Sequence, residues 1–159
     1  MKSKIYQVKV FENGIIQWKL GGKLHRENGP AVKYADGTEL YFFKGKLHRE
    51  NGPAITCADG REEYYVNDKL HREDGPARKL ANGKEEYFIK GKLHREDGPA
   101  VKLANGKEEY WLNNKKYSKE DFDKEISKRK NKVKKIKKSL ACENKCVIVD
   151  GVKYKLTKV

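Results

Sequence analysis

With 159 residues, of which 38% are charged and 36% hydrophobic, the chain has too little apolar material for a thick core and favours a thin, elongated body. It contains no apolar run of the roughly 20 residues that span a bilayer, and its first residues do not resemble a signal peptide, so we expect a cytoplasmic protein. The net charge of +14 is concentrated in residues 115–139, which contribute +8, whereas residues 15–114 carry 18 basic and 16 acidic side chains.

The first predicted element is a strand at residues 5–11, where apolar and polar side chains alternate. Asn13 and Gly14 follow this strand. This pair is typical of a tight hairpin turn, because both residues accept a positive φ. We assign residues 1–14 to an N-terminal capping strand.

A phrase of eight residues, Leu-His-Arg-Glu-(Asn/Asp)-Gly-Pro-Ala, then occurs four times, with its histidines spaced 23 residues apart without a gap. Self-similarity at a fixed period of this size predicts a repeat array in which each copy stacks on the next. An aromatic-rich strand precedes each phrase, and a second strand, such as residues 31–35, follows it. Asp-Gly or Asn-Gly pairs then predict two-residue turns.

We therefore expect residues 15–117 to form a mainly β, single-layer antiparallel sheet of hairpin repeats. Each unit would consist of a strand, a seven-residue loop, a second strand and a two-residue turn, which gives an elongated meander of about ten strands. Since neighbouring strands lie about 4.8 Å apart, equivalent residues of successive units should lie roughly 10 Å apart.

The loops supply the first candidate site, a stripe of histidine and arginine side chains. Histidines roughly 10 Å apart cannot share one metal ion, because a metal–nitrogen bond is only about 2 Å long, so we expect no metal. The favoured interpretation is structural, with His, Arg and Glu holding the loop and Gly-Pro setting the turn. The other interpretation is a recognition stripe. Its residues are His25, Arg26, His48, Arg49, His71, Arg72, His94 and Arg95.

An enzyme is the least favoured class. An active site is usually unique, whereas every candidate group here occurs in four equivalent copies, with no nucleophile or glycine-rich phosphate loop beside it. No cofactor is indicated. Three cysteines argue against a disulfide framework: Cys57 is expected to be a small core residue, and Cys142 and Cys146 form a single C-x3-C pair, which is too few ligands for a zinc site.

The repeat resembles a known family. Its 23-residue period, the Gly-Lys-Leu-His core at residues 45–48 and 91–94 and the Ala-Asp-Gly ending are similar to the MORN repeat, the membrane occupation and recognition nexus. The phrase is closer still to a variant common in phage, bacterial and giant-virus proteins. The resemblance covers residues 8–117. It implies an elongated sheet of hairpins, and a protein encoded by a phage or a mobile element.

The chain also departs from the MORN pattern. That pattern follows its histidine with glycine, where this chain has arginine in every copy, and its Tyr-x-Gly strand is replaced here by an aromatic pair. The lipid and protein contacts reported for the family therefore do not transfer to particular positions.

The fifth copy stops at Tyr117, where the next histidine would stand. Ser118 followed by acidic residues predicts a helix start. Apolar residues at helical spacing extend this helix over residues 118–140, as a basic amphipathic helix that caps the last repeat. Residues 141–159 are predicted to form a final β-hairpin.

The basic face of this helix is the second candidate site. It has three interpretations. The lysines form a solvated face without a partner, or they bind a nucleic-acid backbone, or they bind an anionic membrane surface. Four aromatic residues, Phe42, Tyr65, Phe88 and Trp111, would either stack bases or form a second buried face. The basic residues are Lys128, Arg129, Lys130, Lys132, Lys134, Lys135, Lys137 and Lys138.

The leading hypothesis is a non-catalytic binding scaffold that engages a protein or nucleic-acid partner through the sheet and the helix. The alternative is an inhibitor that blocks a host defence complex or sequesters a small anionic ligand, which a pocket between the loops would favour. Peripheral attachment to a membrane is a third hypothesis.

Overall fold

The computed structural model describes residues 4–140, 146–149 and 152–155. The chain separates into two compact units, residues 1–117 and residues 118–159. The first unit contains the repeats. The second contains the helix α1 (Lys119–Leu140) and an antiparallel pair of strands, β19 (Cys146–Val149) and β20 (Val152–Lys155).

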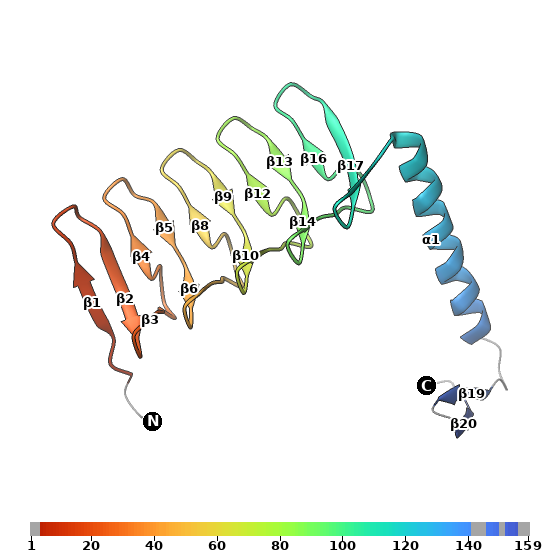
Figure 1. Ribbon diagram of the computed structural model, residues 1–159, viewed down its shortest axis with the longest axis horizontal. Helices are drawn as coiled ribbons and strands as arrows, with labels where there is room; N and C mark the ends of the chain where they lie inside the picture. Colours follow the sequence, from red (N-terminus) through yellow and green to blue (C-terminus); the bar gives the residue numbers. More distant parts are fainter. Residues whose placement is uncertain (1–3, 141–145, 150–151, 156–159) are drawn as a thin grey trace. The chain divides into compact units, whose positions relative to one another are not determined.

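The first unit is built on one antiparallel sheet whose strands pair in chain order, so that each hairpin stands beside the next (Figure 1). Together with the single helix and the β19–β20 pair, this meander confirms the predicted fold class. The path of the sheet runs through β1 (Gln7–Val10), β2 (Ile16–Leu20), β4 (Val32–Lys33), β5 (Glu39–Leu40), β8 (Ile55–Thr56), β9 (Glu62–Glu63), β12 (Arg78–Lys79), β13 (Glu85–Glu86), β16 (Val101–Lys102), β17 (Glu108–Leu112) and β18 (Lys115–Tyr117).

Each repeat contains a short strand that the sequence pattern does not predict. The Lys-Leu residues before each histidine, expected to belong to the loop, pair back on the aromatic run instead. The strand of the main sheet ends just before the first aromatic residue of the run, and the next strand starts just after it. Three of these hairpins are therefore separate two-stranded ladders. The short strands are β3 (Lys23–Leu24), which pairs with β2, and the pairs β6 (Phe42–Phe43) with β7 (Lys46–Leu47), β10 (Tyr65–Val66) with β11 (Lys69–Leu70), and β14 (Phe88–Ile89) with β15 (Lys92–Leu93).

The turns of these short hairpins have positive φ at both central residues. Lys44 and Gly45 have φ of 51° and 84°, and Asn67 and Asp68 have φ of 50° and 63°. This geometry is that of a type I′ turn, whose twist matches that of the flanking strands. The turn that the sequence pattern places at Asp-Gly therefore occurs here, beside the histidine loop.

The Asp-Gly and Asn-Gly pairs make a different turn. Tyr34 N–H donates to Thr38 O (2.9 Å) and Gly37 N–H donates to Tyr34 O (3.1 Å), which closes a three-residue turn. Gly37, and not Asp36, has a positive φ (91°). The Asp36 carboxylate instead accepts a hydrogen bond from Thr38 N–H (2.8 Å). The predicted two-residue turn is therefore a type I turn followed by a glycine bulge.

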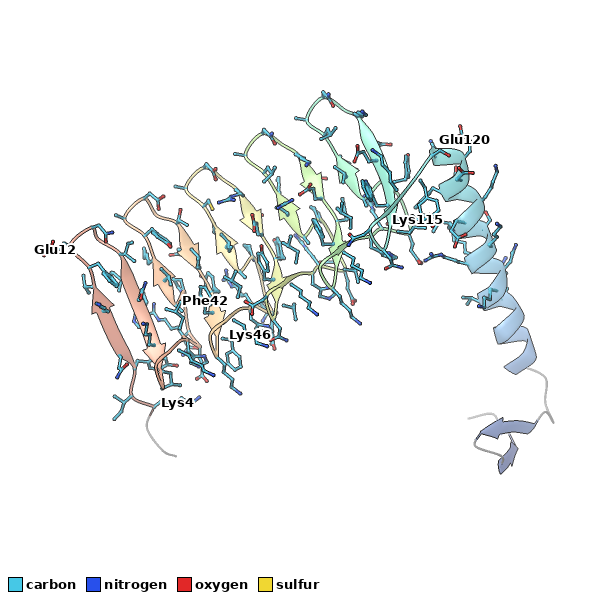
Figure 2. The ribbon with its side chains drawn as sticks, in the orientation of Figure 1. Lys4, Glu12, Phe42, Lys46, Lys115 and Glu120 are labelled. Atoms are coloured by element: carbon cyan, nitrogen blue, oxygen red, sulfur yellow. The ribbon has the colours of Figure 1, made fainter. Side chains whose placement is uncertain are left out.

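These two kinds of turn lie at opposite ends of the strands. In Figure 2, Glu12 marks the end with the three-residue turns, and Lys46 marks the end with the short hairpins. Side chains project from both faces of the sheet (Figure 2). A single layer of this kind buries few large side chains. The alanine of each phrase is fully buried, with Ala31, Ala54, Ala77 and Ala100 all 0% exposed, and Leu112 is the largest side chain buried to a similar degree.

One row of side chains crosses the sheet from β2 to β17 on the face opposite the loops. Its central part is ionic: Arg78 lies between Glu63 and Glu86 in the register, and these two glutamates are only 6% and 5% exposed. Glu86 forms ion pairs with Arg78 and Lys84, and Glu63 forms one with Arg61. Carboxylates this deeply buried need such partners, because desolvation disfavours an isolated charge. The row consists of Gln17, Val32, Leu40, Ile55, Glu63, Arg78, Glu86, Val101 and Glu109.

The helix α1 begins as the sequence pattern indicates. Asp121 N–H donates a hydrogen bond to Ser118 Oγ (3.1 Å), which satisfies an amide of the first turn. Glu120 and Asp121 place negative charge at the positive end of the helix dipole. Phe122 and Ile126 are buried and Val133 is exposed. That the helix caps the last repeat stays a prediction.

The type I′ turns provide a test of this fold. Lys44 and Lys90 occupy the position at which the other repeats have Asn67 and Asn113, and asparagine tolerates positive φ better than lysine does. We expect Lys44→Asn and Lys90→Asn to raise the free energy of unfolding by about 0.5–1 kcal/mol each. Urea unfolding followed by circular dichroism measures this. Lys46→Asn, at an extended position, is the control, and an equal gain there would contradict the assignment.

Candidate functional site

The four loops, residues 25–30, 48–53, 71–76 and 94–99, are called loops 1 to 4, and one hydrogen-bond pattern holds them all. The backbone amide of each histidine donates to the first aromatic residue of its own repeat, as in His71 N–H to Tyr64 O (3.0 Å). The ring nitrogen Nδ1 accepts a hydrogen bond from a turn amide of the following repeat. These bonds join Lys44 N–H to His25 (2.9 Å), Asn67 N–H to His48 (3.3 Å), Lys90 N–H to His71 (3.2 Å) and Asn113 N–H to His94 (3.1 Å).

Each histidine ring therefore links two repeats. Its other nitrogen, Nε2, lies 3.7–3.9 Å from the glutamate two residues later. The His25 ring is the most buried, with 4% of its side chain exposed against 16–20% for the other three. His25 also contacts the Phe43 ring at a centroid distance of 4.8 Å.

The arginine of each loop lies on an aromatic ring eight residues earlier in the chain. Its backbone amide donates to the next repeat, as in Arg72 N–H to Phe88 O (3.1 Å). A guanidinium over a ring is attracted by the electrons of the ring face, and such a contact contributes about 0.5–2 kcal/mol. The distances from Cζ to the ring centroid are 4.0 Å for Arg26 over Trp18, 3.7 Å for Arg49 over Tyr41, and 4.1 Å for both Arg72 over Tyr64 and Arg95 over Tyr87.

The glycine of the phrase makes room for this guanidinium. A Cβ atom at Gly75 would lie 3.0 Å from Arg72 Cζ, and one at Gly29 would lie 3.2 Å from Arg26 Cζ. At Gly29 the backbone also has a φ of 137°, which side chains rarely adopt. A side chain at this position would press on the guanidinium, and at Gly29 and Gly52 it would also meet a strained backbone.

Loops 3 and 4 differ from loops 1 and 2 at one position. Asp74 and Asp97 stand where the first two loops have Asn28 and Asn51. Arg72 Nε donates to Asp74 Oδ1 at 2.8 Å, and Arg95 Nε donates to Asp97 Oδ1 at 2.7 Å. These hydrogen bonds lower the pKa of both aspartates, so both carboxyl groups are charged at neutral pH.

Four grooves of similar size hollow the loop face. Groove 1 lies between β1 and loop 1, and grooves 2, 3 and 4 lie between successive loops, with volumes of about 520, 440, 390 and 460 Å³ respectively. The lining of each includes an aromatic residue that carries a stacked arginine: Trp18, Tyr41, Tyr64 or Tyr87. Arginine and glutamate side chains of the adjoining loops form the walls.

Sequence reasoning missed the aromatic partners, the grooves and the role of the Asn/Asp position. The sequence did contain a signal for the aromatic partners, because the aromatic residue stands eight residues before the arginine in all four repeats. The grooves carried no comparable signal, since their walls come from different repeats.

The second set of aromatic residues, Phe42, Tyr65, Phe88 and Trp111, is neither fully exposed nor fully buried. Tyr65 Oη–H donates to Glu63 Oε2 (2.9 Å) and Trp111 Nε1–H donates to Glu109 Oε2 (3.1 Å). Burial and this hydrogen bond raise the pKa of Tyr65 to about 12. Their hydrogen bonds place Tyr65 and Trp111 on the face opposite the grooves, and base stacking there stays a prediction.

The basic helix shows a clear exposed set of charges. Lys128, Lys130, Lys132 and Lys134 are exposed. Arg129 Nε instead donates to Glu125 Oε1 one turn earlier, at 3.1 Å. The side chains of Lys135, Lys137 and Lys138 lie outside the described residues.

No group of three or more His, Cys, Asp or Glu side chains that could hold a metal ion occurs within the described residues. Cys142 lies outside them. Among the helices described, none combines the length and the apolar character required to cross a bilayer.

The glycine–arginine contact predicts a double-mutant result. Gly75→Ala should displace the Arg72 guanidinium from Tyr64 and lower the free energy of unfolding by about 1 kcal/mol. In the Arg72→Ala background the same Gly75→Ala change should cost much less, because nothing remains for the new Cβ to displace. Thermal unfolding of the four proteins measures the coupling, and equal costs in both backgrounds would show that the contact is unimportant.

The histidine bond predicts a second result. His71→Ala leaves the Lys90 amide without its acceptor, and we expect a loss of about 1 kcal/mol or more in stability. Binding of a partner per folded molecule should be unchanged if the histidine is structural. Wild-type stability combined with lost binding would favour the recognition stripe. The measurements are urea unfolding and a binding titration on the same samples.

Comparison of the sequence with protein-family models and with curated proteins finds no match in either. The similarity to MORN repeats therefore rests on the repeated residues themselves. Most of these residues have a structural partner within the array. The grooves and the basic helix are the surfaces that offer a ligand side chains in solvent.

Proposed function

We propose that the protein is a non-catalytic binding scaffold in which the repeat array carries a basic helix that binds the phosphate backbone of nucleic acid. The observation that carries this proposal is the run of exposed lysines along α1, from Lys128 to Lys134. Residues 128–138 contain eight basic and no acidic side chains, whereas residues 119–127 contain two basic and four acidic ones.

The charge of the helix is therefore separated along its length. At a rise of about 1.5 Å per residue, the basic segment extends over roughly 15 Å, and a nucleic-acid duplex presents one phosphate charge per about 1.7 Å of its axis. Several lysines can then neutralise phosphates together and release counterions. Lysine acts as a point charge rather than a reader of base edges, so this contact tolerates any base sequence.

The grooves between the loops bear on the alternative, an inhibitor that sequesters a small anionic ligand. Grooves of this kind were the feature expected to favour it. Their lining argues against an anion, however, because carboxylates of the loops equal or outnumber the arginines in grooves 2, 3 and 4. The scaffold with a nucleic-acid-binding helix remains the better supported proposal.

The test replaces Lys128, Lys130, Lys132 and Lys134 with glutamine, which removes four charges and preserves helix propensity. Binding of the wild-type protein to duplex or single strands should weaken steeply with salt, with a log–log slope near −0.7 to −0.9 per neutralised phosphate. The variant should bind more weakly with a flatter slope and little dependence on base sequence. Gel-shift titrations at two salt concentrations measure both quantities.

A matched control removes four exposed lysines from the array instead, by Lys33→Gln, Lys46→Gln, Lys79→Gln and Lys92→Gln. Net charge changes equally in the two variants, so only a local role of the helix separates them. Absence of any retardation at low salt would overturn the proposal. Binding to vesicles of anionic lipid in place of nucleic acid would indicate the membrane surface.

A further inference from the structure

The four grooves are similar in size and differ in charge. With histidine neutral, the lining residues of grooves 1, 2, 3 and 4 carry formal charges of +1, 0, −1 and −2. Groove 4 is lined by two arginines and four carboxylates. The charge therefore falls in equal steps along the array.

The change from asparagine to aspartate makes groove 4 the most acidic. Loops 1 and 2 each contribute one arginine and one glutamate, which cancel, whereas loops 3 and 4 each add an aspartate. Groove 4 lies between the two loops that have this aspartate. Glu73 at its wall has a side chain that is 84% exposed, so its charge faces solvent.

Each groove also has apolar or aromatic residues in its lining. Groove 4 is lined by Tyr87 and Ile89, and groove 2 by Tyr41 and Phe43. A lining that contains both apolar groups and carboxylates suits a lysine or arginine side chain of a partner, since its aliphatic stem can pack on the apolar groups while its charged end meets the carboxylates. The neutral groove 2 suits an uncharged side chain.

The spacing of the grooves selects a backbone conformation for that partner. Successive grooves are one repeat apart, which is two strand spacings, or roughly 10 Å. A polyproline II segment rises about 3.1 Å per residue with three residues per turn. Every third residue of such a segment therefore lies on one face, at intervals of about 9.3 Å, close to the groove spacing.

We propose that the groove row binds an extended, polyproline-II-like segment of a partner protein that presents a side chain at every third residue. Basic residues of this segment occupy grooves 3 and 4, and uncharged residues occupy grooves 1 and 2. The four loops thus read a periodic basic segment in one direction. This site lies in the repeat unit and does not depend on the proposed function of the helix.

The repeats themselves supply the variants for the test. Asp74→Asn and Asp97→Asn convert loops 3 and 4 to the residues of loops 1 and 2, where the arginine stacks on its ring in the same way. The fold should therefore tolerate them. The control is Asp36→Asn with Asp59→Asn, which makes the same change in charge at three-residue turns where other repeats have Asn82 and Asn105.

The probe is a fluorescent peptide of four Pro-Pro-Lys triplets, titrated with the full-length protein at low salt and followed by fluorescence polarisation. We expect saturable binding that weakens about fivefold or more in the Asp74→Asn, Asp97→Asn variant and stays within about twofold of wild type in the control variant. Asn28→Asp with Asn51→Asp, which makes groove 2 acidic, should strengthen binding.

A peptide with the same number of lysines in Pro-Pro-Pro-Lys units tests the spacing. A four-residue period turns each lysine away from the preceding one on a polyproline II helix, so this peptide should bind more weakly. Equal binding of the two peptides, equal loss in the two double variants, or no binding of the Pro-Pro-Lys peptide would each overturn the proposal.

Discussion

A hydrogen bond between a turn amide and the histidine ring of the preceding repeat connects the local geometry of this chain to its stacking. The amide belongs to the first central residue of a type I′ turn, as in Lys90 N–H to His71 Nδ1. Within each repeat most strands pair over only two residues, so the β-ladder alone provides few hydrogen bonds. The hydrogen bonds between histidine rings and turn amides add to the ladder, and each of them needs both the turn and the neighbouring repeat.

The arginine of the loop depends on this frame in turn. Its guanidinium occupies the space between an aromatic ring and a glycine, so the ring, the arginine and the glycine have to occur together. The Asn/Asp position beside them is free to vary, because Arg26 and Arg72 stack alike although Asn28 and Asp74 differ. A constant frame with a variable charge gives four grooves of similar size and different charge.

The two units differ in electrostatic character. The array has nearly balanced charges, with carboxylates facing solvent at the grooves, whereas the helix concentrates lysine over residues 128–138. A polyanion is attracted to the second surface and gains nothing from the acidic grooves of the first. The two proposed binding surfaces therefore suit different classes of partner, which is the property expected of a scaffold.

Much of this architecture follows from the sequence alone. The 23-residue period determines a stacked array, the alternation and turn residues determine an antiparallel meander, and Ser118 with the acidic residues after it determines where the helix starts. These features depend on residues that are close in the chain, so a local pattern is enough to predict them. The prediction of a two-residue turn at the Asp-Gly pairs was wrong, and the two-residue turn at Lys44 and Gly45 was not predicted, because an Asp-Gly pair suits either turn and the strand register decides between them.

The tertiary structure alone decided the partners of the loops. The amide bonded to each histidine ring comes from a residue 19 positions later, and the two walls of a groove come from different repeats. A local sequence pattern does not predict such a partner, because the two groups come together only when the repeats stack. The charge of grooves 2, 3 and 4 therefore depends on two neighbouring loops. The sequence contains the charged residues of both loops, and only the stacking brings them together.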